Sequence, residues 1–487
     1  MAVRRLVART PLAALDPVFA AIRAREGVRE DYADAVLAEA SVGTQEDPEH
    51  VVGERHHLTD VPFVTIDPVG SRDLDQALHL ARHDGGWRLR YAIADVAAHV
   101  SPGGALDADT RARGETVYCP DTRVGLHPPV MSEGFASLLP GQRTKAVVWE
   151  IDIDATGHLA RVDVARAWVR STRQFSYPEV SAPADDATRE LARTLREVGD
   201  VRRAAMRERG AVTLPKPSQE VVASGGELTL EFRAATAVED DNAQLSLLAG
   251  EAAAALQIEA GVGILRTMPP ADEESVARLR RQARAIGIDW PREWSYGDVL
   301  ATVDPASAAG AAFLVHAVTL FRGAQWEAFD VRPDAPVTMP LPQQASHGAL
   351  GAPYAHVTAP LRRLADRFAT EVCVAHAAGV PVPGWVTEAL PTVPDAQVGG
   401  ARRGAAVDRA CVNAVEAALL GPHVGESFVA VGLDERTVQL TRPAVVGRCG
   451  GEIPVGEDVE VSLVSASAEN GPRFEVLRRL PSAVPHA

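Results

Sequence analysis

The sequence predicts an α+β protein that ends in a small β-barrel, and three observations lead to this fold class. From Val61 to about residue 233, much of the chain alternates apolar and polar residues, as half-buried strands do. After residue 240 the chain becomes rich in alanine and leucine at helical spacing. Residues 425–477 return to short alternating segments separated by glycines, with the length and rhythm of a five-stranded OB-fold.

Length and composition indicate an ordinary soluble globular protein. The 487 residues suffice for two or more domains, and 23% of them are charged. No apolar run is long enough to cross a membrane, so we expect no membrane partner. The four cysteines are far apart and include no Cys-x-x-Cys pair, which argues against a disulfide framework or a zinc ribbon. This cysteine usage favours the cytoplasm as the location of the protein. We also expect the protein to be a monomer.

The first 55 residues are expected to form a small helical region. The pair Asp16–Pro17 indicates a helix start, and a second helix is expected from Glu30 to Ala40. The polar, acidic stretch from Thr44 to His57 is interpreted as a linker. The main elements expected further along are strands at 145–153 and 159–169, a hairpin at 219–233, and helices at 185–209, 242–260, 361–377 and 401–420.

Three aspartates stand close together after the strand-like segment Phe63–Ile66. Asp67 ends this segment, a short loop follows, and Asp73 and Asp75 then share one face if the chain is extended. Carboxylates brought together repel one another unless a cation lies between them, and hard divalent ions prefer oxygen ligands. Aspartate and glycine also cluster in solvated turns for backbone reasons. The spacing alone therefore leaves a metal site and a simple turn as equal alternatives.

The aspartate stretch resembles the signature of the RNB family, the catalytic domain of RNase II-like and RNase R-like 3′-to-5′ exoribonucleases. The family pattern Thr-Ile-Asp-Pro, a loop, and Asp-Leu-Asp-Asp-Ala is matched at residues 65–68 and 73–77. Further segments follow in the family's order, at residues 91–96, 113–118, 132–138, 354–366 and 406–409. The resemblance implies an RNB catalytic domain over residues 56–420, between a helical region (1–55) and an OB-fold-like domain (421–487). It is similar to short forms of actinobacterial type that lack N-terminal cold-shock domains.

The resemblance implies hydrolysis at the 3′ end of single-stranded RNA, with release of nucleoside 5′-monophosphates. This reaction needs an activated water and neutralised phosphoryl charge, which Mg²⁺ or Mn²⁺ supplies. The matching metal positions are Asp67, Asp73, Asp75 and Gln76, and Asp75 also matches the family's most catalysis-critical aspartate. Gln76 departs from the family pattern, because it offers an amide oxygen without a charge.

Arg362 matches the family arginine that contacts the scissile phosphate region, and we expect it to be catalytic and RNA-binding. Its guanidinium can hold a phosphate through two parallel hydrogen bonds. The preceding Thr358–Pro360 indicates a helix start, which would place Arg362 near a helix N-terminus. A surface salt bridge with Asp366 is the alternative role for Arg362. Arg363 is a further RNA-binding candidate.

Tyr118 and Asp408 complete the RNA-binding set that the resemblance implies. Tyr118 matches a tyrosine that stacks on the 3′-terminal base, a contact available to any base. Asp408 falls at the position of a family glutamate and could accept hydrogen bonds from ribose hydroxyls, which favours RNA over DNA. The alternative for Asp408 is an ion pair with Arg402 or Arg409 on a helix surface.

Two other functions stay open at the level of sequence. The main alternative is a catalytically inactive RNA-binding protein with the RNB fold, because Gln76 removes one charge from the metal positions. A phosphoesterase for small substrates is disfavoured by Tyr118 and by a barrel suited to a polymer. The net charge of −16 decides nothing, since it is an average over the molecule and local arginine pairs can still line a channel.

Overall fold

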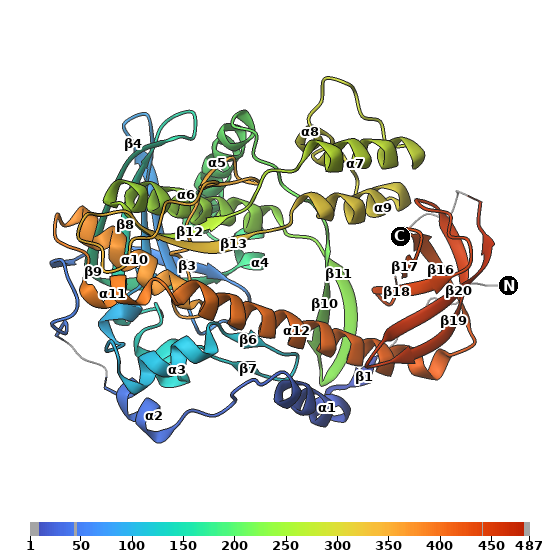
Figure 1. Ribbon diagram of the computed structural model, residues 1–487, viewed down its shortest axis with the longest axis horizontal. Coiled ribbons are helices and arrows are strands. Elements are labelled where there is room, and N and C mark those ends of the chain that lie inside the picture. The colour runs from blue at the N-terminus through green and yellow to red at the C-terminus, as the bar shows by residue number, and fades with distance from the viewer. Residues whose placement is uncertain (1–8, 43–45, 441, 482–487) are drawn as a thin grey trace.

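The computed structural model describes residues 9–42, 46–440 and 442–481 of the chain. It confirms the α+β fold class: a six-stranded mixed sheet is flanked by helices, and a closed five-stranded barrel ends the chain. The long helix α12 (Val393–Leu420) runs from the sheet-containing body to the barrel (Figure 1). None of the helices in the described ranges is long and apolar enough to cross a membrane.

The mixed sheet is the framework of the body. Its strand order is β2 (Arg55–His57), β9 (Leu159–Ser176), β3 (Phe63–Asp67), β4 (Gln76–His83), β5 (Gly86–Ala94) and β8 (Arg143–Ile153). β9 pairs antiparallel with β8 along its first part and parallel with β2 and β3 along its last part. The sheet therefore curls round on itself. The β4–β5 turn has positive φ at Asp84 (46°) and Gly85 (80°), the type I′ geometry that matches the strand twist.

The N-terminal region is helical, as expected, but its helices have different bounds. α1 (Leu12–Arg25) begins before Asp16–Pro17, so Pro17 lies inside the helix and does not start it. The earlier start follows from β1 (Thr10–Pro11), which pairs with β11 (Glu227–Arg233) and is followed directly by the helix. α2 (Asp34–Ala40) begins four residues later than expected.

The linker expected at residues 44–57 is wrong for its last part. Arg55–His57 form β2, whose backbone groups are satisfied by pairing with β9. Asp47 also accepts two hydrogen bonds of 2.7 Å from the Arg55 guanidinium, which attaches the preceding loop to the sheet. Residues 43–45 lie outside the described residues.

Helices α5 (Asp186–Glu208), α6 (Ala237–Ala260) and α10 (Leu364–Ala377) pack in series against the sheet. Their apolar faces share one core with the sheet, including Leu195, Val198, Leu248 and Ala252. The helix expected at 185–209 is confirmed, with Asp185 as its cap. α6 begins earlier than expected because Thr236 and Glu239 form a capping box there.

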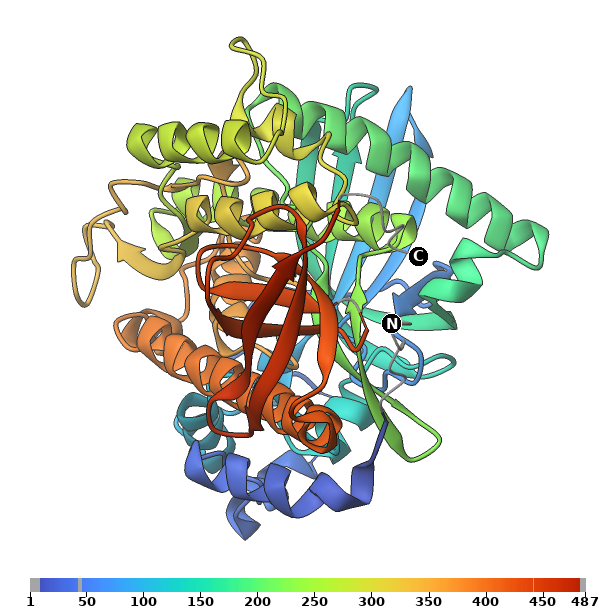
Figure 2. The same ribbon diagram turned by 90° about the vertical axis from the view of Figure 1, so that its right-hand side faces the viewer.

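The barrel is closed in the order β16 (Ser427–Gly432), β17 (Thr437–Leu440), β18 (Val445–Gly450), β20 (Gly471–Arg479) and β19 (Asp458–Ser467). It stands in front of α9 (Ala308–Ala317) and of the hairpin formed by β10 (Ser218–Ser224) and β11 (Figure 2). The end of α12 packs on β19 and β20, so the expected five-stranded module is confirmed and is attached to the body through this helix.

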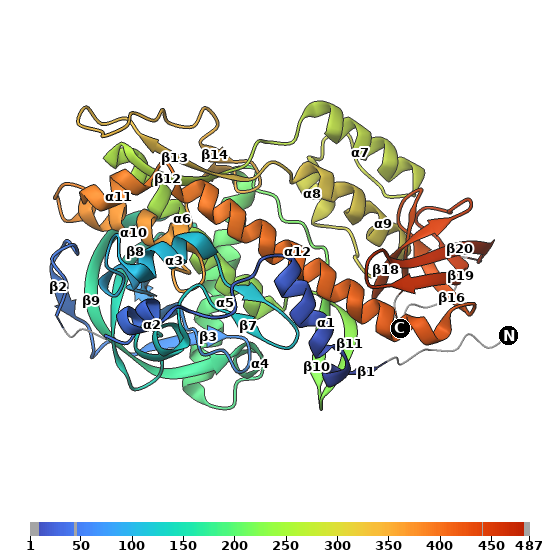
Figure 3. The same ribbon diagram turned by 60° about the horizontal axis from the view of Figure 1, so that its bottom comes forward.

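Shorter elements complete the fold, and several lie along α12 (Figure 3). They are α3 (Ala105–Arg113), β6 (Val117–Tyr118), β7 (Arg123–Val124), α4 (Tyr177–Ser181), β12 (Val262–Thr267), α7 (Glu273–Ala285), α8 (Tyr296–Leu300), β13 (Gln325–Asp330), β14 (Ser346–His347), β15 (Ala352–Pro353) and α11 (Gly384–Ala389). α1, α3 and β6 all pack against α12. This arrangement places the β6–β7 hairpin between the sheet and the long helix.

Candidate active site

The aspartates are positioned by the end of β3 and the segment that leads into β4. Leu74 is fully buried, which leaves its neighbours Asp73 and Asp75 on the opposite side of the chain. The Asp75 carboxylate is only 4% exposed, accepts a 2.8 Å hydrogen bond from the Leu361 N–H, and lies 3.6 Å from Arg362 Nε. Leu74 and its two aspartate neighbours therefore point to opposite sides of the chain, as the sequence predicts. This orientation brings Asp75 to the loop that carries Arg362.

Burial disfavours the charged form of two of these carboxylates. It raises the pKa of Asp75 to about 8, although Arg362 and the Leu361 N–H act in the opposite direction. Burial likewise raises the pKa of Asp67 to about 6. Asp67 Oδ2 is buried without a hydrogen-bond partner. For both groups the effect of burial therefore exceeds the stabilisation that the nearby Arg362 charge gives to the ionised form.

Asp73 has a partner that the sequence analysis missed. Arg123, the cross-strand neighbour of Tyr118 in the β6–β7 hairpin, forms ion pairs with both Asp73 and Glu133. The hairpin therefore delivers an aromatic ring and a guanidinium to the site together. The available signal was the short spacing between Tyr118 and Arg123, which a hairpin prediction would have placed opposite each other.

Gln76 is held by a contact that an aspartate could not make. Its Nε2 donates a 2.5 Å hydrogen bond to the Thr358 carbonyl oxygen. A carboxylate has no donor for this bond when ionised. The amide nitrogen is thus engaged with the loop before Arg362, and the amide oxygen is the atom of Gln76 that can serve a cation.

All of the predicted site residues line two neighbouring cavities. The first, of about 840 Å³, is the acidic cavity; it is lined by Asp67, Asp73, Asp75, Gln76, Tyr118, Arg123, Tyr177 and Arg362, among others. The second, of about 260 Å³, is the helix-side cavity; it is lined by Glu115, Thr116, Tyr118, Arg362, Arg363, Gly404, Ala405 and Asp408. Tyr118 and Arg362 belong to both. Tyr118 is 51% exposed, so its ring is free to contact a ligand.

The two adjacent arginines have different roles in the structure. The helix start expected at Thr358–Pro360 is wrong, because α10 begins only at Leu364. Asp366 accepts hydrogen bonds from the Ala359 N–H (2.8 Å) and from the Arg363 guanidinium, which keeps residues 359–363 in a loop. The ion pair with Asp366, which was the alternative role for Arg362, is therefore formed by Arg363. The Arg362 side chain stays 42% exposed beside Asp75.

α12 forms one wall of the helix-side cavity because it approaches the loop after α3 very closely. A Cβ atom at Gly400 would lie 2.7 Å from the Glu115 nitrogen, so only glycine allows this contact. Asp408 lies eight residues, or about two turns, further along the helix and is exposed. Burial raises the pKa of Asp408, and the nearby charge of Arg409 acts in the opposite direction. Among the described residues, no ion pair joins Asp408 to Arg402 or Arg409.

The oxygen atoms of the acidic cavity are only partly arranged to bind a hard divalent cation. Among the described residues, no three His, Cys, Asp or Glu side chains are arranged to hold a metal ion. Asp73 is turned to Arg123, whereas Asp67 and Asp75 are buried oxygens that a cation would stabilise. Asp67, Asp75 and the Gln76 amide oxygen therefore fit such an ion, and Asp73 can join them if Arg123 releases it.

Comparison with known proteins decides the family. The family model described as the RNB domain matches residues 55–375, more than half of the chain. The chain belongs to the RNB family. A second model, the RNase II-type exonuclease C-terminal S1 domain, matches residues 427–476 and so falls on the barrel of this RNB protein. Nucleases of the RNB family are metal-dependent.

Relatives of this RNB protein include Ribonuclease R of Acidithiobacillus ferrooxidans, which is 36% identical over 156 residues. That match covers 32% of the chain and 36% of the relative, so the aligned region spans about a third of the relative's length. Mycoplasma genitalium RNase R, solved in complex with ribose-methylated single-stranded RNA, has the same fold with a TM-score of 0.79. It is 19% identical, and the match covers 95% of this chain and 78% of that one.

The same fold also occurs in a yeast pseudonuclease. That structure has a TM-score of 0.64 and 15% identity, and the match covers 92% of this chain and 57% of the yeast chain. The fold of the RNB protein is therefore compatible with a protein described as a pseudonuclease. The side chains of the two cavities, and not the fold, must carry any argument for activity.

Proposed function

We propose that this RNB protein is a metal-dependent hydrolase that shortens single-stranded RNA from its 3′ end and releases nucleoside 5′-monophosphates. The observation that carries the proposal is that the buried Asp75 and the half-buried Asp67, whose Oδ2 atom is buried, line one cavity with the exposed Arg362. Buried carboxylates with raised pKa values are costly to keep, and they are a common feature of catalytic sites.

In this proposal Asp67, Asp73 and Asp75 hold Mg²⁺ or Mn²⁺, with the Gln76 amide oxygen as a neutral ligand. When bound, the metal activates a water and neutralises charge on the phosphoryl oxygens. Arg362 binds the phosphate through its guanidinium, which is held close to Asp75 by the Leu361 N–H contact. Arg123 is the internal counter-ion of Asp73 while no cation is bound.

The helix-side cavity is proposed to hold the end of the RNA. Tyr118 stacks on the terminal base, and Asp408 on α12 accepts a hydrogen bond from a ribose hydroxyl. Arg363 keeps its pairing with Asp366 and adds positive charge beside the phosphate without forming a bidentate contact. We also propose that the division into residues 1–55, 56–420 and 421–487 describes the domains, and that the protein acts as a monomer.

The second candidate is a catalytically inactive RNA-binding protein. Two observations favour it: Gln76 supplies no charge, and the fold occurs in a pseudonuclease. Asp67, Asp73, Asp75 and Arg362 all line the acidic cavity, which favours activity. The two candidates differ in whether RNA is shortened, so a direct assay separates them.

The deciding experiment uses a 5′-labelled, unstructured RNA with and without Mg²⁺ or Mn²⁺. Wild type should yield a metal-dependent ladder from the 3′ end and free mononucleotides, and Asp75→Asn should abolish both. Asp84→Asn is the matched control, because this aspartate is exposed in the β4–β5 turn, and it should leave the ladder unchanged. Binding without shortening, with shortening restored by Gln76→Asp, would instead establish the inactive form.

A further inference from the structure

Arg123 on the β6–β7 hairpin holds two carboxylates of the acidic cavity at once, each with a different nitrogen atom. Its Nη1 pairs with Asp73 Oδ1, and its Nη2 pairs with Glu133 Oε1. The three side chains are between 13% and 28% exposed, so all of them are partly shielded from water. Because the two ion pairs use separate nitrogens, the contact with Asp73 can be lost while the contact with Glu133 stays.

Glu133 is a firmly held anchor for this guanidinium. It lies on the irregular turn Met131–Phe135, within which Gly134 departs from helical backbone angles. Gln142 Nε2 donates hydrogen bonds of 3.1 Å to the Gly134 and Phe135 carbonyl oxygens, so the acceptors that the irregular turn leaves free are satisfied. The turn that carries Glu133 is therefore fixed by its own contacts, independently of Asp73.

The ion pair with Arg123 occupies a carboxylate that the proposed metal site needs. A guanidinium and a divalent cation repel each other, so both cannot stay on the Asp73 carboxylate at contact distance. Releasing a partly buried guanidinium without a second partner is costly, and Glu133 is that second partner. Arg123 and Arg362 both line the acidic cavity, so the released Nη1 is available to an anion there.

We propose that Arg123 exchanges partners when the site is loaded: it leaves Asp73 and binds an RNA phosphate, while Glu133 holds it in both states. Arg123 lies directly opposite Tyr118 in the hairpin, so the phosphate of the nucleotide that stacks on Tyr118 is within its reach. This inference rests on the proposed function. It adds a second arginine on the scissile phosphate and makes Arg123 a determinant of metal affinity.

The affinity for Mn²⁺ tests the exchange, and calorimetric titration of the metal-free protein measures it. Arg123→Gln should bind Mn²⁺ about tenfold or more tightly than wild type, because the competing charge is gone. Glu133→Gln should bind Mn²⁺ about fivefold more weakly, because the released guanidinium loses its anchor. A gain of affinity in Arg123→Gln cannot come from a misfolded protein.

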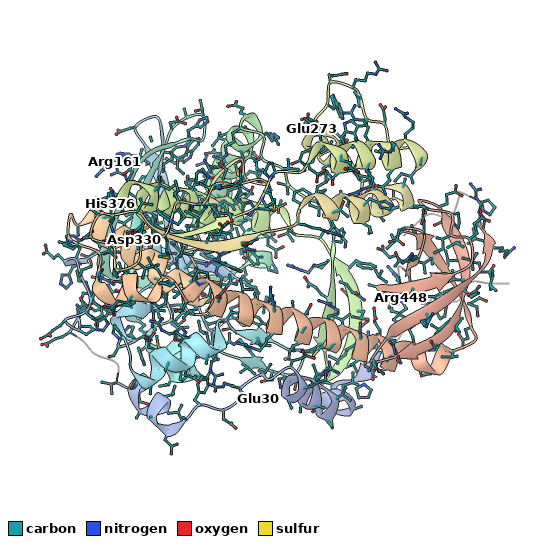
Figure 4. All side chains as sticks on the ribbon, in the orientation of Figure 1. Glu30, Arg161, Glu273, Asp330, His376 and Arg448 are labelled. Atoms are coloured by element: carbon teal, nitrogen blue, oxygen red, sulfur yellow. The ribbon has the colours of Figure 1, made fainter. Side chains whose placement is uncertain are left out.

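Two comparisons separate this role from a general effect of charge. In the Arg123→Gln background, Glu133→Gln should change Mn²⁺ affinity by less than about twofold, because Glu133 acts through the guanidinium. Arg72→Gln is the matched control and should also stay within about twofold. Arg72 lines the same cavity and lies 3.8 Å from Glu133, but among the described residues it forms no ion pair with Asp73. Arg161→Gln on β9, an exposed residue labelled in Figure 4, is the remote control.

The phosphate contact is tested with a short RNA in which a methylene group replaces the bridging 3′-oxygen of the last linkage. This probe keeps the phosphoryl charge and resists hydrolysis. With saturating Mn²⁺, Arg123→Gln should bind it about tenfold more weakly than wild type, because a charge-assisted contact is lost. With a chelator the two proteins should agree within about twofold, because Asp73 then engages the guanidinium. A merely structural role for Arg123 would weaken binding equally in both conditions.

These measurements decide the inference separately from the proposed function. The exchange is overturned if Arg123→Gln binds Mn²⁺ no more tightly than wild type, or if its loss of RNA affinity is the same with and without Mn²⁺. Either result can occur in a protein that shortens RNA. Equal weakening by Glu133→Gln in both backgrounds overturns its role as the anchor. If both affinities change as expected but wild type does not shorten RNA, the hydrolase proposal fails and the partner exchange stands.

Discussion

The acidic cavity and the helix-side cavity share Tyr118 and Arg362, yet they are built in different ways. The acidic cavity takes its carboxylates from the sheet framework, where Leu74 is locked in the core and Asp75 is almost fully buried. The helix-side cavity is assembled from a hairpin, a loop and α12, and its Tyr118 and Asp408 are exposed. In the proposed function, the metal-binding carboxylates therefore come from one continuous segment of the sheet, whereas the contacts with the RNA end come from a hairpin, a loop and α12 that must pack together.

The largest effect is expected for Asp75→Asn, which removes charge from the acidic cavity alone. We expect single-turnover hydrolysis to fall on the order of 10³-fold, because several kcal/mol of metal-dependent stabilisation is lost. RNA affinity measured with the metal chelated should stay within about twofold, since the helix-side cavity is intact. If RNA affinity fell together with the rate of hydrolysis, the acidic cavity would also contribute to RNA binding.

A somewhat smaller loss is expected at Arg362, the residue that belongs to both cavities. Arg362→Ala should lower hydrolysis about 10²-fold and weaken RNA binding as well, because a charge-assisted phosphate contact disappears. Arg362→Lys keeps the charge but not the paired geometry, so it should recover binding more than rate. Equal recovery of both would argue that Arg362 acts only as a point charge.

Tyr118→Ala tests the helix-side cavity alone. Loss of base stacking costs about 1–3 kcal/mol, which corresponds to RNA binding weakened roughly 5- to 150-fold. Calorimetric affinity for Mn²⁺ should not change, because Tyr118 offers the metal no ligand in this arrangement. Tyr118→Phe retains the ring and is the control, so it should bind RNA as wild type does. Weaker RNA binding by Tyr118→Phe would show that the hydroxyl group, and not the ring, makes the contact.

The acidic cavity should also make the metal-free fold sensitive to pH. The pKa of Asp75 rises from 3.8 to about 8 on folding, so its stabilising contribution is complete below pH 3.8 and is lost as pH rises through 8. Between pH 5 and 9, the free energy of unfolding of wild type should fall relative to Asp75→Asn by on the order of 3 kcal/mol. Urea unfolding in the presence of a chelator measures this, and parallel pH profiles for the two proteins would count against it.

The smallest effect is expected for Asp408→Asn in the helix-side cavity. One lost hydrogen bond to a ribose hydroxyl is worth about 1 kcal/mol, so the preference for RNA over DNA should drop about fivefold. Competition between RNA and DNA of the same sequence measures the preference. Asp395→Asn, near the start of the same helix, is the control and should keep it. An unchanged preference in Asp408→Asn would assign this aspartate to the helix surface.

Local rules predicted which side chains around Leu74 leave the core, but the family resemblance, and not the spacing, selected these aspartates as a site. The alternation around Leu74 fixes which side chains leave the core, and the same rule places Asp73 and Asp75 together. The expected helix start at Thr358–Pro360 was wrong, because Asp366 accepts hydrogen bonds from the Ala359 N–H and the Arg363 guanidinium and so keeps residues 359–363 outside the helix. The Arg123–Asp73 ion pair requires the tertiary packing of the β6–β7 hairpin, which no spacing rule contains.

The continuity of α12 has a consequence for the length of ligand that the molecule can engage. Asp408 sits in a cavity wall, and the same helix ends at Leu420 against the barrel. With about 1.5 Å of rise per residue, the intervening residues hold the two regions roughly 18 Å apart along the helix axis. The number of residues between Asp408 and Leu420 therefore sets the distance between the helix-side cavity and the barrel. This distance does not depend on which side chains line the cavity or the barrel.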